Sequence, residues 1–404
     1  TYMLQIDHIY EFLHNSVFKD FELHAFEKGV PTESSYIIFN KTVSPRKILF
    51  YDQEPILDKL SDPYLDYFNI PYTDIAKNRK QYPELYNNIL EGNELDDYIA
   101  WYTKFVKKPF VLVTSEKSII QKQMSEKYGF ENLYYFYHGF AALDWFRGYQ
   151  ALNYDKEIVR EYDKDFITYN RLIKEDRSYR IYLVSLLKEY DLLDKGFVSF
   201  GVTDAISDWR DEISDPKTRL SEQQKDSIER NLTDITRLTI DNASVLGSAS
   251  ADIPREQDAF WHVVTETVFY HSKMHLTEKI FKPIVNKQPF MLLAAPDNLA
   301  YLKSYGFKTF DSVIDEDYDI CQDNQERINK VVSQLHWYAN LSPSDKTDVQ
   351  EHLKPIIEHN FNHFYGEFRH INAKELITNT KSLFNDINYT SQVDWQSIHQ
   401  LLTS

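Results

Sequence analysis

Short apolar runs that alternate with amphipathic stretches are the feature that most constrains the fold of this chain. Four such runs in the first half are four to six residues long, mostly β-branched or aromatic, and apolar throughout: 36–39, 47–51, 109–114 and 133–137. Runs without a polar face are typical of strands buried on both sides of a parallel sheet. The stretch 116–128, between the last two runs, has a helical pattern. Together these patterns predict an open α/β sheet.

A second alternation of the same kind follows the polar stretch 153–164. It predicts strands at 166–169, 197–200, 261–265 and 289–294, and helices at 177–190, 277–286, 297–305, 325–338, 346–360 and 373–385, with an acidic helical excursion at 207–238. Two α/β units in series predict an α/β fold of two Rossmann-like domains with the ligand in the cleft between them. We expect these domains at 1–155 and 156–372, and a C-terminal helical segment at 373–404 that can pack back on the first domain.

The composition fits a folded chain of two domains without a membrane span. Its 404 residues are 42% hydrophobic, which is ample core material and excludes a largely disordered chain. The net charge of −17 disfavours generic binding to nucleic-acid phosphates. The single cysteine, Cys321, excludes a disulfide framework, and no apolar run approaches the ~18–20 residues that span a bilayer. We expect a cytoplasmic protein, see no signal peptide, and predict no obligate protein partner.

The most informative segment is Leu276–Ile284, which begins Leu-Thr-Glu-Lys. Thr277 can serve as the N-cap of a helix, and Glu278 and Lys279 then lie in its first turn. Free backbone N–H groups and the positive end of the helix dipole attract an anion there. The carboxylate can accept both hydroxyls of a ribose while the ammonium meets a phosphate. The alternative is an ordinary amphipathic helix that opens with Thr-Glu.

Thr277-Glu278-Lys279, followed by an apolar helix, Gln288-Pro289-Phe290 and a buried strand, resembles the donor-nucleotide module of GT-B glycosyltransferases. The likeness is strongest to fucosyltransferase- and exostosin-type enzymes, and it covers about 166–201 and 260–319. Those families carry an earlier Glu at a strand end, which implies a donor-binding role for Glu266. The resemblance implies a GT-B fold, with an acceptor-side N-terminal domain, a nucleotide-sugar donor domain and an active site in the interdomain cleft.

A second polar segment, Tyr169–Arg180, lies between a predicted strand and a predicted helix. Its side chains gather at the carboxyl end of the strand, where open α/β sheets bind ligands. Arg177 and Arg180 are three residues apart, hence on one helix face, and could form a fork for a diphosphate. The GT-B families named above carry an Asn followed by an Arg here, which implies donor binding by Asn170 and Arg171. The alternative is a solvated loop of mixed charge.

Two segments in the first half offer a catalytic base for an acceptor hydroxyl. Asp52 and Glu54 directly follow an apolar run, and His138 ends another run just before a glycine that permits a tight turn. In two-domain transferases of this type the base usually comes from the N-terminal half. The alternatives are a helix cap for the Asp-Gln-Glu-Pro segment and a carbonyl partner for His138. The choice between Asp52 and Glu54 stays open.

An acidic segment raises the question of a metal. Asp315 and Asp317 match the Asp-x-Asp that holds Mn²⁺ or Mg²⁺ in GT-A transferases, and the acidic residues up to Glu326 fall at calcium-loop positions. Position six of that loop is Ile320, where the sharp turn needs glycine. We therefore interpret the segment as an acidic cap for the helix that starts near Gln325, and predict no metal.

The resemblance implies a metal-independent glycosyltransferase, a hexosyl- or pentosyltransferase, with a nucleotide-diphosphate sugar as co-substrate and no further cofactor. The acceptor would be a hydroxyl of a glycan or of a modified DNA base. The style of several segments also looks like phage-encoded transferases, which would place the protein in the host cytoplasm. Two alternatives stay open: a metal-dependent nucleotide-sugar enzyme built on Asp315 and Asp317, and a non-catalytic nucleotide- or carbohydrate-binding protein. The donor base, the sugar and the stereochemical course also stay open.

Overall fold

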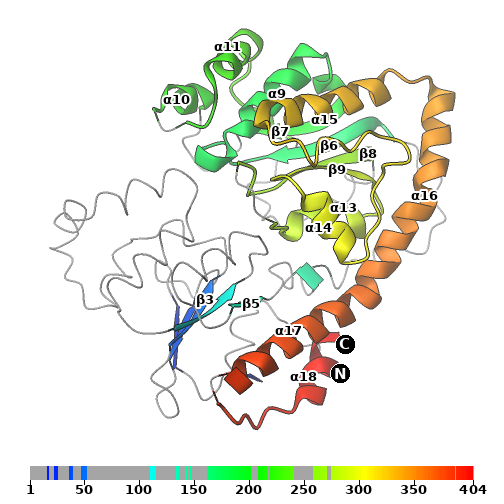
Figure 1. Ribbon diagram of the computed structural model, residues 1–404. Coiled ribbons are helices and arrows are strands. Elements are labelled where there is room, and N and C mark those ends of the chain that lie inside the picture. The colour runs from blue at the N-terminus through cyan, green and yellow to red at the C-terminus, as the bar shows by residue number, and fades with distance from the viewer. Residues whose placement is uncertain are drawn as a thin grey trace, which may run out of the picture. The chain divides into compact units, whose positions relative to one another are not determined.

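The computed structural model describes residues 16–17, 22–25, 36–39, 47–51, 110–114, 133–135, 142–143, 146, 162–201, 208–216, 218–240, 258–270, 274–386 and 388–403. The chain divides into two compact units (Figure 1). One unit comprises Thr1–Asp144 together with Arg369–Ser404, and the other comprises Trp145–Phe368. None of the helices in the described part of the chain has the length and the apolar character that a bilayer crossing requires.

The first unit contains a five-stranded sheet in the order β1-β2-β3-β4-β5. Its strands are β1 (Glu22–Ala25), β2 (Tyr36–Phe39), β3 (Lys47–Tyr51), β4 (Phe110–Thr114) and β5 (Leu133–Tyr135). Four of the five positions confirm the predicted strands, but a purely parallel sheet is wrong, because β1, β2 and β3 pair antiparallel. Only residues 40–46 join β2 to β3, and a parallel crossover needs about a dozen residues or more.

Two C-terminal helices also belong to this unit: α17 (Glu367–Asp386), except for its first two residues, and α18 (Trp395–Thr403). The first was predicted at 373–385, and the second lies within the predicted helical segment 373–404, although its bounds were not predicted. Phe384 lies near the end of α17 with 3% of its surface exposed, and its ring packs against Tyr389 and Trp395. These aromatic contacts turn the chain back on itself between the two helices.

The second unit, Trp145–Phe368, contains four parallel strands in the order β7-β6-β8-β9. They are β6 (Lys164–Asn170), β7 (Gly196–Phe200), β8 (Ala259–Thr265) and β9 (Phe290–Leu293). The connecting and flanking helices are α9 (Tyr179–Glu189), α10 (Trp209–Ser214), α11 (Glu222–Asn231), α13 (Glu278–Val285), α14 (Asn298–Ser304), α15 (Asn324–Ala339) and α16 (Pro343–Tyr365). The parallel sheet and all four strand positions confirm the prediction for this half.

Helices cover both faces of this sheet, with α9 and α15 on one face and α13 and α14 on the other (Figure 1). All seven residues of β8 are buried, as a central strand between two helical layers requires. Trp261 in β8 is fully buried and meets Phe310 and Tyr338 edge to face. This aromatic packing fixes the position of β8, and with it the segment that follows the strand.

The helix α13 is also attached to α16, the longest helix of this unit. Phe281 of α13 packs against Phe364 and Phe307, with ring centroids 5.3 and 5.8 Å away. His363 donates a hydrogen bond through Nε2 to the carbonyl of Tyr305 at 2.6 Å. Gly306 has φ of +95°, and a Cβ there would lie 2.7 Å from the His363 ring, so this turn requires glycine. Phe281 thus packs the body of α13 against α16 and against Phe307, which follows this turn.

Candidate functional site

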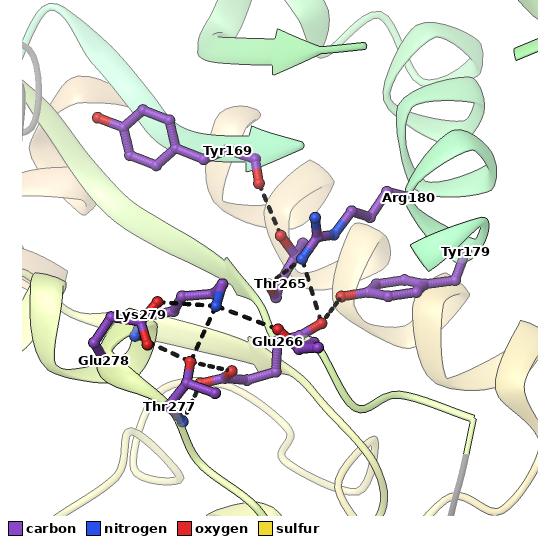
Figure 2. A network of polar contacts seen from close by, with 9 residues as sticks. Tyr169, Tyr179, Arg180, Thr265, Glu266, Thr277, Glu278 and Lys279 are labelled. Atoms are coloured by element: carbon purple, nitrogen blue, oxygen red, sulfur yellow. Dashed lines mark hydrogen bonds and ion pairs between the residues drawn. The ribbon is translucent and has the colours of Figure 1, made fainter. Parts of the chain in front are cut away.

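The four-stranded sheet has a topological switch point between β6 and β8. From β6 the chain continues to β7, toward one edge of the sheet, and from β8 it continues to β9, toward the opposite edge. The segments that leave the carboxyl ends of β6 and β8 therefore diverge, and open α/β sheets bind ligands at such a point. Asn170 is the last residue of β6, and Glu266 is the first residue after β8. The candidate site is this end of the sheet together with the start of α13 (Figure 2).

The start of α13 confirms the sequence prediction. Thr277 is the N-cap, with an extended backbone, and its Oγ1 accepts a hydrogen bond from Lys279 N at 3.3 Å. Glu278 and Lys279 occupy the first turn. The apolar residues Ile280 and Phe281 that follow are fully buried, so packing of the helix body sets the direction of its N-terminal end.

Glu266 lies fully buried next to this first turn. Its Oε2 accepts a hydrogen bond from Thr277 Oγ1 at 2.6 Å, and its Oε1 accepts one from Thr277 N at 3.2 Å (Figure 2). Burial raises the pKa of Glu266, and the nearby Lys279 ammonium opposes that rise. The resemblance assigns Glu266 to donor binding. In the structure, however, both of its carboxylate oxygens are hydrogen-bonded to Thr277, the N-cap of α13.

The Lys279 ammonium is surrounded by oxygen atoms of its own protein. It lies 3.0 Å from Glu278 Oε1, 3.2 Å from Thr277 Oγ1 and 3.3 Å from Thr267 Oγ1. The Lys279 side chain is 24% exposed and the Glu278 side chain 7% exposed. An ammonium and a carboxylate thus lie side by side at the positive end of a helix, and the Lys279 side chain keeps part of its surface open to solvent.

Arg180 and Tyr179, at the start of α9, hold the ends of the two central strands together. Arg180 is 4% exposed, and its guanidinium donates to the carbonyls of Thr265 at 2.8 Å, Leu172 at 2.9 Å and Glu266 at 3.4 Å. The Tyr179 hydroxyl donates to the carbonyl of Glu266 at 2.7 Å (Figure 2). These bonds fix the backbone from which the Glu266 side chain reaches Thr277.

The two arginines of the predicted phosphate fork lie in different environments. Arg177 ends the 3-10 helix η4 (Glu175–Arg177) and is partly exposed, whereas Arg180 is buried on main-chain carbonyls. The neighbouring Asp176 pairs with Arg219 at 3.2 Å. Of the two predicted fork members, Arg177 is the one with surface that a ligand could reach.

The residues at the end of β6 are held by the sheet. Asn170 is fully buried; its N–H donates to Ser199 Oγ at 3.0 Å and its Nδ2 to Thr168 Oγ1 at 3.2 Å. Arg171 is partly exposed. Within the described ranges, Asn170 Oδ1 and Arg171 Nε are buried polar atoms without a hydrogen-bond partner. An acceptor and a donor are therefore still unused at the switch point.

The candidate bases Asp52, Glu54 and His138 lie outside the described residues. The site also contains residues that the sequence analysis did not name. Thr267 contacts Lys279, and a polar side chain two positions past a buried strand is a signal that could have found it. Tyr179 left no such signal, because an aromatic residue at the start of an amphipathic helix looks like a core residue.

The acidic segment is used to cap helices and turns. Asp319 accepts hydrogen bonds from Leu299 N at 2.9 Å and Ala300 N at 3.3 Å, in the first turn of α14. Asp323 is the N-cap of α15, which confirms the interpretation of this segment as a cap near Gln325. Asp315 and Asp317 are exposed, and Asp315 Oδ1 accepts from Asp317 N. Over the described ranges, no group of three or more His, Cys, Asp or Glu side chains is arranged to hold a metal ion.

The cap at Asp319 predicts a distinctive pH dependence of stability. Burial raises the pKa of Asp319 to about 6, whereas an unfolded aspartate titrates near 3.9. The folded protein therefore binds this proton more tightly, so the contribution of Asp319 to stability is largest below about pH 4 and is lost as the pH rises through 6. We expect the unfolding free energy of the wild type, relative to Asp319→Asn, to fall by up to about 3 kcal/mol between pH 4 and pH 7. Urea denaturation of both proteins at four pH values measures this difference, and parallel pH profiles would contradict it.

No family model matches this chain, and no curated protein or solved structure matches it either. The function proposed below therefore depends on the chemistry of the residues just described. A carboxylate, an ammonium, hydroxyls and helix-terminal N–H groups suit a ligand that carries both hydroxyls and phosphates.

Proposed function

We propose that the protein is a GT-B glycosyltransferase that moves a sugar from a nucleotide-diphosphate donor to a hydroxyl acceptor. The observation that carries this proposal is the Glu278–Lys279 pair in the first turn of α13, next to the switch point of a parallel sheet. A carboxylate can accept two hydroxyls of a ribose, and an ammonium at a helix N-terminus can meet a phosphate. A nucleotide presents both groups within one molecule.

The reaction places its main electrostatic demand on the leaving group. Breaking the anomeric C–O bond leaves a nucleoside diphosphate with new negative charge, and preorganised donors stabilise that charge. Lys279, the first-turn N–H groups of α13 and Arg177 would supply these donors. Glu278 would hold the ribose, and the partly exposed Arg171 would add a contact at the end of β6.

The acceptor side is proposed for residues 1–155, with Asp52, Glu54 or His138 as the base that takes the acceptor proton. The net charge of −17 favours a glycan over a modified DNA base as the acceptor. We assign the donor chemistry to the protein alone, without a metal, and we place the enzyme in the cytoplasm. The two-domain GT-B arrangement is part of the same proposal.

Thermal unfolding with nucleoside diphosphates tests the donor site. In the presence of EDTA, we expect one of UDP, GDP, CDP, ADP and dTDP to raise the melting temperature by about 5–10 °C at 100 times its Kd, because a ligand that binds only the native state stabilises it by about 2.7 kcal/mol at that concentration. The shift should disappear in Lys279→Ala and persist in Lys308→Ala, which removes an exposed lysine outside the site.

Each contrary result has a separate meaning. A shift that EDTA abolishes would favour the metal-dependent enzyme built on Asp315 and Asp317. If a diphosphate raises the melting temperature of Lys279→Ala as much as that of the wild type, the nucleotide binds away from the start of α13. If none of the five diphosphates changes the melting temperature, the nucleotide-sugar proposal is wrong.

A further inference from the structure

All four polar atoms of Glu266 form hydrogen bonds within its own unit. Its N–H donates to the Leu293 carbonyl at 2.9 Å, and its carbonyl accepts from Tyr179 and Arg180. Both carboxylate oxygens are bonded to Thr277, and the residue has no exposed surface. In this arrangement a ligand has no access to the carboxylate, which is bonded to the residue that caps α13.

The contact between Glu266 and Thr277 decides where the hydroxyl proton of Thr277 points. A threonine hydroxyl has one proton and two lone pairs, and a carboxylate in its charged form, which Lys279 and the hydrogen bonds from Thr277 favour against the effect of burial, can only accept. With its proton on Glu266 Oε2 at 2.6 Å, Thr277 Oγ1 presents its lone pairs to Lys279 N at 3.3 Å and Lys279 Nζ at 3.2 Å. The buried carboxylate therefore makes Thr277 an acceptor toward both the backbone and the ammonium of Lys279.

We propose that Glu266 is a positioning residue, which acts through the Thr277 hydroxyl to hold the Lys279 ammonium and the first turn of α13 in place for an anionic ligand. This inference rests on the proposed function and adds to it a role for Glu266 that requires no contact with the donor. The chain of contacts runs from Glu266 Oε2 to Thr277 Oγ1 and from there to Lys279 Nζ (Figure 2).

The role makes a specific prediction for Glu266→Gln. A glutamine keeps the size of the side chain but places an NH₂ group, a donor, where an acceptor was. If that group donates to Thr277 Oγ1, it occupies one lone pair and turns the hydroxyl proton toward the Lys279 donors. Lys279 then loses an acceptor although its own side chain is unchanged.

A double-mutant cycle tests this chain of contacts, with inorganic pyrophosphate as the probe and calorimetric titration as the measurement. We expect Glu266→Gln and Thr277→Val each to weaken pyrophosphate binding about fivefold to tenfold, and the double variant to bind no more weakly than Thr277→Val alone. Thr277→Ser, which restores the hydroxyl, should bind within about twofold of the wild type. Glu212→Gln, at a buried glutamate of α10 outside this network, should leave binding unchanged. If Thr277→Val fails to fold, Thr277→Ala replaces it in the cycle.

Two outcomes of the cycle would overturn the inference. If the loss of pyrophosphate affinity in the double variant equals the product of the two single losses, Glu266 acts independently of the Thr277 hydroxyl. If Glu266→Gln binds pyrophosphate as tightly as the wild type, Glu266 has no positioning role. Failure of the wild type to bind pyrophosphate counts against the proposed function instead. In that case hydrogen exchange of the Lys279 amide decides on the positioning role, which requires equal acceleration in Glu266→Gln, Thr277→Val and the double variant.

Discussion

Replacing Arg180 with methionine is expected to lower the unfolding free energy of the unit that contains β6–β9 by about 3 kcal/mol. The buried guanidinium donates to the carbonyls of Leu172, Thr265 and Glu266. Hydrogen bonds from a charged donor contribute about 1.5–3 kcal/mol each, although these values do not add. Methionine fills most of the same volume but leaves the carbonyls without their donor. Scanning calorimetry should record a fall in melting temperature of about 6–12 °C.

Arg177→Met is the matched control, because it makes the same change three residues earlier on a partly exposed side chain. We expect its melting temperature to stay within about 3 °C of the wild type, in keeping with an exposed position. Its affinity for the nucleoside diphosphate should fall about tenfold if Arg177 meets a phosphate, a loss of about 1.4 kcal/mol. Equal destabilisation by the two substitutions would contradict the separate roles assigned to these arginines.

Glu278→Gln is expected to change the affinities for two related ligands in opposite directions. In the wild type, Glu278 Oε1 forms an ion pair with the Lys279 ammonium at 3.0 Å. Loss of its charge should strengthen binding of inorganic pyrophosphate about threefold, because an anion no longer competes with the carboxylate for Lys279. The same change should weaken binding of the nucleoside diphosphate about tenfold, because the acceptor for the ribose hydroxyls loses its charge.

Titration calorimetry with both ligands on the same protein measures this split. The matched control is Glu326→Gln, since Glu326 also lies in the first turn of a helix, α15, but is exposed and lies in a different part of the unit. Both affinities should stay within about twofold of the wild type in that variant. Affinities that move in the same direction in Glu278→Gln would show that Glu278 does not separate ribose from phosphate.

The features that the sequence predicted correctly are those that depend on neighbours in the chain. The strands β6–β9 are visible as apolar runs because both of their faces are buried. The start of α13 is visible because a threonine cap acts on the N–H two residues later. The direction of pairing was not visible for β2 and β3, since an apolar run reports burial and carries no information about its partner strand.

The features that escaped prediction depend on residues distant in sequence. Arg180 looks like a surface arginine until Thr265 and Glu266 are brought next to it by the pairing of β6 with β8. The cap of α14 is a clear case: Asp297 stands at the N-cap position with φ of +68° and makes no side-chain cap bond, and Asp319 supplies the acceptor from beyond the helix. Spacing alone made the same acidic segment resemble a metal loop.

The pairing of β6 with β8 has a consequence for the order in which this unit folds. It joins Lys164 to Ala259 and Thr168 to Val263, residues roughly 95 positions apart, and contacts this distant form slowly because a long loop must close before they stabilise anything. The strands β6 and β7 are separated by only the short segment 171–195, which contains α9, and can assemble earlier. Glu266 and Thr277 both follow β8 in the chain, so we expect the contact between them to form only after β8 has found its place beside β6.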